Sequence, residues 1–213
     1  MPEARTPRRR SGLQQERSRQ TRQRLVRSAL ELWTARGFET GIEDTTVEEI
    51  VRVAGVTKGT FYFHFARKEE ILLDMGWETA AVVNEEAQRC VKAERTLEES
   101  LTRMLAALTA RIRSAPPAAV ARSIAEFHRQ PMSEHASGGR TGFALGIQLV
   151  FARAQEVGEL PSAVEPSEIA KMLQAMVMDS ILDWTASHSD LRAALRLRSS
   201  ILVAGLKEPA LLR

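Results

Sequence analysis

The sequence predicts an all-α protein of about nine or ten helices. Apolar residues recur at three- and four-residue spacing through most of the chain, which is the helical period. Clusters of Pro, Gly and Ser interrupt this pattern at clear breaks, such as Pro116-Pro117 and Ser137-Gly138-Gly139. No segment alternates apolar and polar residues between turn signals, as a half-buried strand does. We therefore expect helices throughout, packed around shared apolar stripes.

The N-terminal segment predicts a basic arm followed by a first helix. Residues 1–16 contain Pro, Gly, Arg and Gln with almost nothing to bury, so a flexible arm is expected there. The first helix is expected from about Ser18 to Arg36. Its apolar face would consist of Leu25, Ala29, Leu32 and Trp33. Gly37 would end it in the left-handed conformation, and Phe38 would fold back on the core.

Two short helices joined by a tight turn are expected next. Residues 39–45 are interpreted as a loop, after which a capping box pairs either Thr45 with Glu48 or Thr46 with Glu49. The buried stripe of this helix would consist of Val47, Ile50, Val51 and Ala54. Gly55 tolerates the positive φ that the turn requires, and Val56 would fill the angle between the helices. The next helix, about Thr57 to Phe63, would be capped by Thr57 and anchored by Phe61 and Phe65.

Such a pair of helices is the plan of a helix-turn-helix DNA-binding motif. Thr57, Lys58 and Thr60 lie on the first turn of the second helix, where short side chains and amides reach base edges and phosphates. Gly59 has no side chain, which would let this helix approach a groove closely. The front of the chain is also basic, with 14 Lys and Arg against 8 Asp and Glu in residues 1–68. That balance favours an anionic partner such as nucleic acid.

The segment from Thr46 to Leu72 (TVEEIVRVAGVTKGTFYFHFARKEEIL) resembles the DNA-binding segment of the tetracycline-repressor (TetR) family of transcriptional regulators. The matching positions are Thr46, Ile50, Ala54-Gly55-Val56, Thr57, Gly59, Phe61-Tyr62, His64-Phe65, Lys68-Glu69 and Leu72. The resemblance implies a homodimer that binds an operator in double-stranded DNA. It implies a DNA-binding domain over residues 17–67 and a helical domain for effector binding and dimerisation over residues 68–213.

The resemblance also assigns roles to single residues. Thr46 and Lys68 would hold phosphates at helix N-termini, and Tyr62 and His64 would bind phosphates through the hydroxyl and the ring N–H. The base edges would be read from Lys58, Gly59 and Thr60, with Thr57 beside them. Thr46 and Thr57 could instead serve only as helix caps. Lys68, with Glu69 and Glu70, would open the long helix that follows.

The C-terminal half is predicted to be helical, and it resembles the family only in layout. The helices expected there are Thr96–Arg113, Ala118–His128, Thr141–Val157, Pro166–Ser187 and Leu191–Leu206. The helices over 142–157 and 166–187 are interpreted as the dimer interface, with close packing at Gly146 and Ser180. The proposed stripe on the second helix is Ile169, Leu173, Met176, Val177, Ser180 and Trp184. Both stripes could instead belong to the core of one chain.

A small, mostly apolar effector is expected among the middle helices. The candidate pocket residues are Trp77, Phe127, Met132, Phe143, Met172 and Met176. Effector binding would release a repressor from its operator. An activator and an effector-free architectural protein stay open as alternatives.

Other functional classes find little support in the residues. No catalytic motif is present, so no enzyme and no cofactor are expected. A metal sensor would have to use Glu126, His128, Glu134 and His135. The two histidines are seven residues apart, a poor spacing for two ligands on one helix. A redox switch would depend on Cys90 alone, and a single cysteine fits a reducing cytoplasm. No run of about 18 apolar residues predicts a membrane span.

Overall fold

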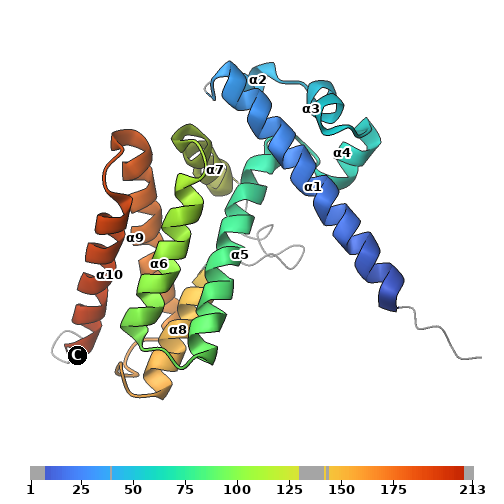
Figure 1. The fold of residues 1–213 in the computed structure, drawn as a ribbon. Coiled ribbons are helices and arrows are strands. Elements are labelled where there is room, and N and C mark those ends of the chain that lie inside the picture. Colours follow the sequence, from blue (N-terminus) through green and yellow to red (C-terminus); the bar gives the residue numbers. More distant parts are fainter. Residues whose placement is uncertain (1–7, 39, 130–141, 143, 209–213) are drawn as a thin grey trace, which may run out of the picture. The chain divides into compact units, whose positions relative to one another are not determined.

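The computed structural model describes residues 8–38, 40–129, 142 and 144–208 of the 213-residue chain. These residues form ten helices and no strand, which confirms the all-α prediction (Figure 1). The chain divides into two compact units, residues 1–71 and residues 72–213. Within the described ranges, no helix is both long and apolar enough to cross a membrane.

The first unit is built from four helices around an aromatic core. They are α1 (Arg8–Arg36), α2 (Gly41–Asp44), α3 (Val47–Ala54) and α4 (Lys58–His64). Helix α1 packs against α2 and α3, and α3 packs against α4. The fully buried side chains at their centre are Leu25, Ala29, Trp33, Ile50 and Phe61, with Phe65 at 1% exposure. The indole of Trp33 meets the ring of Phe38 edge to face, as the predicted fold-back of Phe38 requires.

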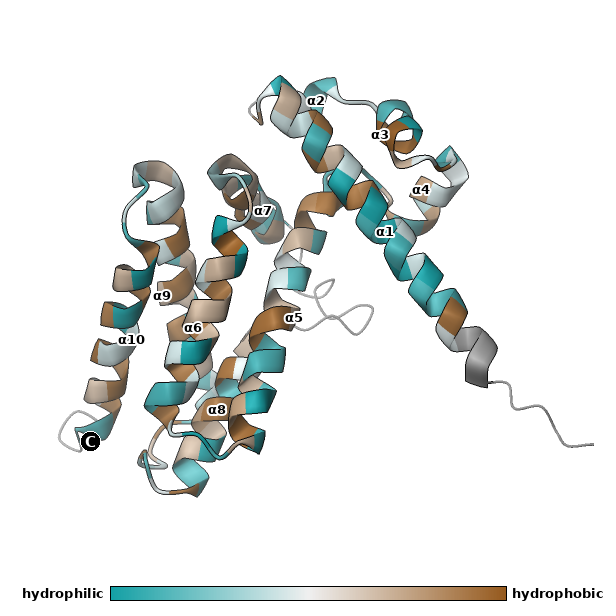
Figure 2. Cartoon of the chain, viewed as in Figure 1, coloured by the Kyte–Doolittle hydropathy of each residue, from teal (hydrophilic) through white to brown (hydrophobic). Residues whose placement is uncertain are grey.

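Helix α1 begins at Arg8, well before the predicted start at Ser18, so residues 8–16 are helical and not an extended arm. The residues of this stretch are mostly Arg, Gln and Glu, which lose little side-chain freedom in a helix. Glu16 adds local support, because it forms an ion pair with Arg19 at 3.3 Å. The N-terminal half of α1 is largely hydrophilic (Figure 2). The apolar pattern of the sequence therefore underestimated the length of α1, because the N-terminal part of this helix has little to bury.

The segment predicted as a loop before α3 contains the short helix α2. Ile42 is 3% exposed, so this turn has an apolar anchor in the core. The Thr45 hydroxyl donates to the Gly41 carbonyl at 2.6 Å, which ties the end of the helix to its start. Four residues are too few for an apolar period to be recognised in the sequence.

The second unit contains most of α5 (Glu70–Lys92) and five further helices. They are α6 (Leu97–Arg113), α7 (Pro117–Arg129), α8 (Ala144–Glu156), α9 (Pro166–Ser187) and α10 (Leu191–Lys207). Helix α9 is central, since it packs against α7, α8 and α10. The predicted helices of this half agree with the observed ones to within a few residues. The boundary between the units falls inside α5, after Ile71, a few residues beyond the predicted boundary at Lys68.

Candidate nucleic-acid interface and cavity

The turn between α3 and α4 has the local chemistry that the sequence predicts. Thr46 caps α3, and its side chain and that of Glu49 form the reciprocal capping box, which selects the second of the two registers. Gly55 ends α3 with φ of 66°, a left-handed conformation that costs a glycine nothing. Thr57 then caps α4, with its hydroxyl oxygen 3.2 Å from the Thr60 amide nitrogen. These caps and the left-handed Gly55 define the turn between the two helices.

Helix α4 has one anchored side and one exposed side. Phe61 is fully buried and Phe65 is 1% exposed, as predicted. The exposed side presents Thr57, Lys58, Gly59 and Tyr62, and Tyr62 is 55% exposed. Six of the predicted DNA-contacting residues, including the half-buried Thr60 and His64, thus come from a single short helix and its cap.

Gly59 has no structural reason to be glycine. A Cβ built at this position would meet only the Thr57 hydroxyl, at 3.8 Å, and Gly59 has no positive φ. Glycine in a helix costs roughly 0.5–1 kcal/mol relative to alanine. The packing of this unit therefore does not require a glycine on the exposed side of α4.

Lys58 is held by an ion pair with Glu48 of α3. The hydrogen bond from Lys58 lowers the pKa of the Glu48 carboxyl, and the same bond raises the pKa of the Lys58 amine. Both side chains remain more than half exposed. An anion that approaches α4 must therefore compete with Glu48 for this cation.

Lys68 was predicted to hold a phosphate, but in the structure its side chain binds the backbone of the same unit. Its ammonium group donates to the carbonyls of Glu43 and Thr45, at 2.9 and 2.8 Å. Glu43 is in the last turn of α2 and Thr45 is its C-cap, so Lys68 satisfies carbonyls that a helix end leaves unpaired. The residue also precedes α5, which begins at Glu70. A phosphate contact by Lys68 would have to coexist with this tie.

His64 and its surroundings connect α4 to α1. Arg22 of α1 donates to the His64 carbonyl at 2.7 Å, and its guanidinium lies 4.1 Å from the centre of the Phe65 ring. Phe63, which is not among the predicted DNA-contacting residues, is 78% exposed beside them. Its exposure follows from spacing, because residue 63 falls two positions from both Phe61 and Phe65 and so lies on the opposite face.

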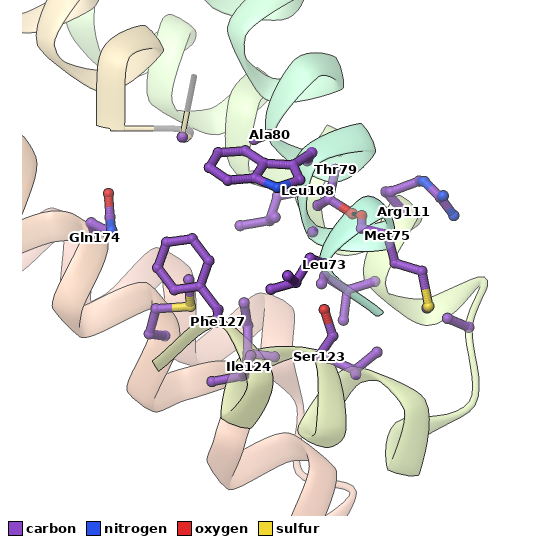
Figure 3. Close-up of a pocket in the computed structure, with 18 residues that line it drawn as sticks. Leu73, Met75, Thr79, Ala80, Leu108, Arg111, Ser123, Ile124, Phe127 and Gln174 are labelled. Atoms are coloured by element: carbon purple, nitrogen blue, oxygen red, sulfur yellow. Dashed lines mark hydrogen bonds between the residues drawn. The ribbon is translucent and has the colours of Figure 1, made fainter. Parts of the chain in front are cut away.

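The second unit contains an apolar cavity between α5, α6, α7 and α9 (Figure 3). Its volume is about 90 Å³. Trp77 of α5 and Phe127 of α7, two of the predicted pocket residues, lie in its wall and pack edge to face with ring centres 5.9 Å apart. Leu108 and Ile124 add further apolar surface. Both Trp77 and Phe127 are thus in position to contact a ligand.

Two other predicted pocket residues, Met172 and Met176, do not line this cavity. Met172 is 52% exposed and Met176 packs against the core, because both lie on other faces of α9. The face of α9 toward the cavity instead presents Gln174, Met178 and Ile181, at helical spacing. Met132 and Phe143 lie outside the described residues.

The stripe predicted as a dimer surface on α9 is part of the chain's own core. Ile169, Leu173, Val177 and Ser180 are each 1% exposed, and Trp184 is 9% exposed. Gly146 also serves packing within the chain, because a Cβ there would lie 2.6 Å from the Asn84 side chain of α5. These residues are therefore not available to a second subunit.

Other apolar side chains of this unit remain exposed. Leu197 and Ile201 of α10 are 62% and 61% exposed, more than any other large apolar side chain described in residues 72–213. Leu182 of α9 is 42% exposed. Arg198 bridges the two helices through Asp179 and Asp183, at 2.6 and 3.0 Å. The outward sides of α9 and α10 thus form a fixed surface with an apolar component.

Cys90 and His128, which were considered for redox and metal chemistry, are engaged within the protein. Cys90 is fully buried, burial raises the pKa of its thiol, and its sulfur lies 3.8 Å from a Glu86 oxygen. His128 contacts the Ile124 carbonyl of its own helix through Nδ1. Among the residues that the structure places, no three His, Cys, Asp or Glu side chains are grouped for a metal ion. Glu134 and His135 lie outside the described residues.

Comparison with known proteins identifies the first unit by sequence. Residues 25–75 match the family model of bacterial regulatory proteins of the tetR family. Over 62 residues, 29% of this chain, the sequence is 48% identical to the HTH-type transcriptional regulator TcmR of Streptomyces glaucescens. A 53-residue stretch, 25% of this chain, is 45% identical to SrpR of Pseudomonas putida. These matches span only about a quarter of each relative, 26% of TcmR and 23% of SrpR.

Solved structures resemble the chain over most of its length. FadR of Thermus thermophilus, a repressor crystallised with lauroyl-CoA, matches with a TM-score of 0.63 and 25% identity over 85% of this chain and 93% of its own. SmeT, the repressor of the Stenotrophomonas maltophilia multidrug efflux pump SmeDEF, matches with a TM-score of 0.61 and 20% identity over 89% and 92%. The second likeness concerns the fold alone.

Proposed function

Because the chain is a member of the TetR family of bacterial transcriptional regulators, we propose that it is a dimeric repressor that leaves its operator when a small, mostly apolar effector binds. The chain is not an enzyme, since this is a family of regulators. Two surfaces support the proposal, the exposed side of α4 and the cavity of the second unit. Each is tested separately.

The observation that carries operator binding is the exposed side of α4. Thr57, Lys58, Gly59 and Tyr62 share this side, at the start of a helix whose opposite side is locked by Phe61. A helix N-terminus attracts phosphate, and short side chains on the first turn can reach base edges in the major groove. Tyr62 and His64 would add phosphate contacts at the end of the helix.

Binding to DNA as a dimer requires two such helices in successive major grooves, roughly 34–36 Å apart. The dimer is proposed to form through the outward sides of α9 and α10, where Leu182, Leu197 and Ile201 are exposed. The sequence predicted an interface of α8 and α9, but the α9 stripe of that prediction is buried within the chain. The interface proposed here keeps α9, through its outward side, and replaces α8 with α10.

Effector response is supported by the cavity and by one neighbour. The wall is mostly apolar, and Met75 and Met178 can change rotamer to accommodate ligands of different shape. The related repressor FadR was crystallised with lauroyl-CoA, so a neighbour of similar fold binds a ligand with a long apolar part. The effector would bind more tightly to a dimer whose two α4 helices are wrongly spaced for DNA, and so would lower operator affinity. The coupling is reciprocal, so operator DNA would lower effector affinity by the same factor.

The first experiment is a DNA-binding titration on the region upstream of the chain's own gene, at two salt concentrations. Specific binding should be in the nanomolar range and should weaken steeply with salt, as phosphate contacts require. Tyr62→Phe should weaken it about tenfold, the value of a hydrogen bond to a charged group. A scrambled fragment of equal length is the control. Absence of specific binding, both here and in a selection from genomic fragments, would refute operator binding.

A further inference from the structure

The polar groups in the cavity wall restrict which effector the proposed function can use. Apart from the indole of Trp77, the N–H and O–H groups among the described lining side chains belong to Thr79, Arg111, Ser123 and Gln174. The Thr79 hydroxyl donates to the Met75 carbonyl at 2.8 Å, and the Ser123 hydroxyl donates to the Leu72 carbonyl at 2.6 Å. Neither hydroxyl therefore has a free proton for a ligand.

Arg111 is the charged side chain of the described wall, and its charge is compensated. It forms an ion pair with Glu78 at 2.9 Å and donates to the Ser114 hydroxyl at 3.2 Å. A carboxylate or phosphate that entered the cavity would lose its hydration without gaining an unpaired cation. The cavity therefore disfavours an anionic ligand relative to an uncharged ligand of similar shape.

Gln174 differs from these three residues. No hydrogen bond joins its side-chain amide to another residue that the structure describes, and the residue is half-buried. In Figure 3 it lies on α9 across the cavity from Arg111, with Phe127 and Ile124 between them. An amide offers both a donor and an acceptor, so it can bind a carbonyl or a hydroxyl equally well.

We propose that the effector is a compact, uncharged molecule with an apolar body and one carbonyl or hydroxyl group, and that this group binds the side-chain amide of Gln174. The inference depends on the proposed effector response of this same cavity. Compactness follows from the cavity volume of about 90 Å³, which is well below that of sites for drug-sized ligands. The apolar body would contact Leu73, Leu108 and Phe127.

Three probes of matched shape test the proposal by calorimetric titration of the full-length protein. They are acetophenone, ethylbenzene and benzoate, which carry a carbonyl, no polar group and a carboxylate. Wild type should bind acetophenone about five- to tenfold more tightly than ethylbenzene, the size of one hydrogen bond. Benzoate should bind at least about tenfold more weakly than acetophenone, because its charge is desolvated.

Two variants assign the preference to named groups. Gln174→Leu should bind acetophenone and ethylbenzene with equal affinity, while its melting temperature without ligand confirms that it folds. Glu78→Gln leaves Arg111 without its ion-pair partner and should strengthen benzoate binding about tenfold, the value of a charge-assisted bond. Both changes leave the α4 surface intact, so operator binding should persist in each variant.

The proposal is overturned if wild type binds benzoate as tightly as acetophenone, if Gln174→Leu retains the preference for acetophenone, or if no probe binds. The proposed function is judged apart from it, by operator titration without any ligand. If wild type binds its operator and another ligand class releases it, the repressor stands and the assigned ligand class is wrong. Failure of operator binding would count against the repressor alone.

Discussion

Lys58 and Glu48 form an ion pair on the surface where α4 is expected to meet DNA. The bond raises the pKa of the Lys58 amine and lowers that of the Glu48 carboxyl, so each stabilises the charged form of the other. Such an exposed pair contributes little to folding. Its main effect is on binding, because a phosphate must displace Glu48 to reach Lys58.

We therefore expect Glu48→Gln to bind the operator several-fold more tightly than wild type, since Lys58 becomes free for phosphate. The slope of log affinity against log salt should steepen by about one unit, the contribution of one added phosphate contact. Fluorescence anisotropy at several salt concentrations measures both quantities. Glu31→Gln is the control, because it removes the same charge from an exposed position on α1. Equal changes in the two variants would mean that only net charge matters.

Gly59 gives the second prediction at this scale. Gly59→Ala should stabilise the protein by roughly 0.5–1 kcal/mol, because alanine is the better helix former and its Cβ meets no close neighbour. The same methyl group would stand between α4 and the groove. Operator affinity should fall at least about tenfold, the size of a lost base contact. A thermal melt and a DNA titration on the same preparation would reveal opposite signs, and unchanged affinity would show that DNA does not approach this residue.

At the scale of elements, the cap of α3 joins three parts of the first unit. Glu49 receives a side-chain hydrogen bond from Arg36 of α1 and a backbone hydrogen bond from Thr46, which together lower the pKa of its carboxyl from 4.5 to about 2. Arg36 also donates to the Asp44 carbonyl at 2.8 Å. One carboxylate thus connects the end of α1 to the start of α3.

This arrangement predicts an acid-dependent loss of stability. The folded-state pKa of Glu49 lies below its unfolded value, so its contribution is full above pH 4.5 and is lost as pH falls toward 2. Glu49→Gln should be less stable than wild type at neutral pH and should lose less stability on acidification across that window. Urea unfolding followed by circular dichroism at several pH values provides the comparison. Parallel pH profiles for the two proteins would show that the Arg36 contact does not stabilise the fold.

Sequence reasoning succeeded where one short pattern determines the structure. Capping residues, Gly55 and the spacing of Phe61 and Phe65 act within a few residues, so they located α3, α4 and their turn correctly. It failed for α1, because a polar helix extends to Arg8 without an apolar period. It also misplaced Met172 and Met176, since the side of α9 that faces the cavity depends on where α5 and α7 pack.

At the scale of the whole molecule, the exposed apolar surface of the second unit bears on assembly. Buried stripes of α9 are shared with α7, α8 and α10, so only side chains outside that core can meet a second copy. Leu197 and Ile201 lie one turn apart on α10, and Arg198 holds this helix to α9 through two aspartates. A symmetric dimer brings the same surface of each copy together, so the exposed apolar side chains of α10 would be buried in both copies.

We expect Leu197→Glu to convert the proposed dimer to a monomer, because the symmetric contact would bury two like charges. Leu145→Glu on α8, at a side chain that is 52% exposed, should leave the dimer intact. Sedimentation velocity measures the assembly state, and thermal melts check that both variants fold. A monomeric Leu197→Glu protein should also lose most of its operator affinity, since one α4 helix then binds without its partner. If Leu145→Glu dissociates the dimer and Leu197→Glu does not, the interface contains α8, as the sequence first indicated, and the exposed side of α10 has another role.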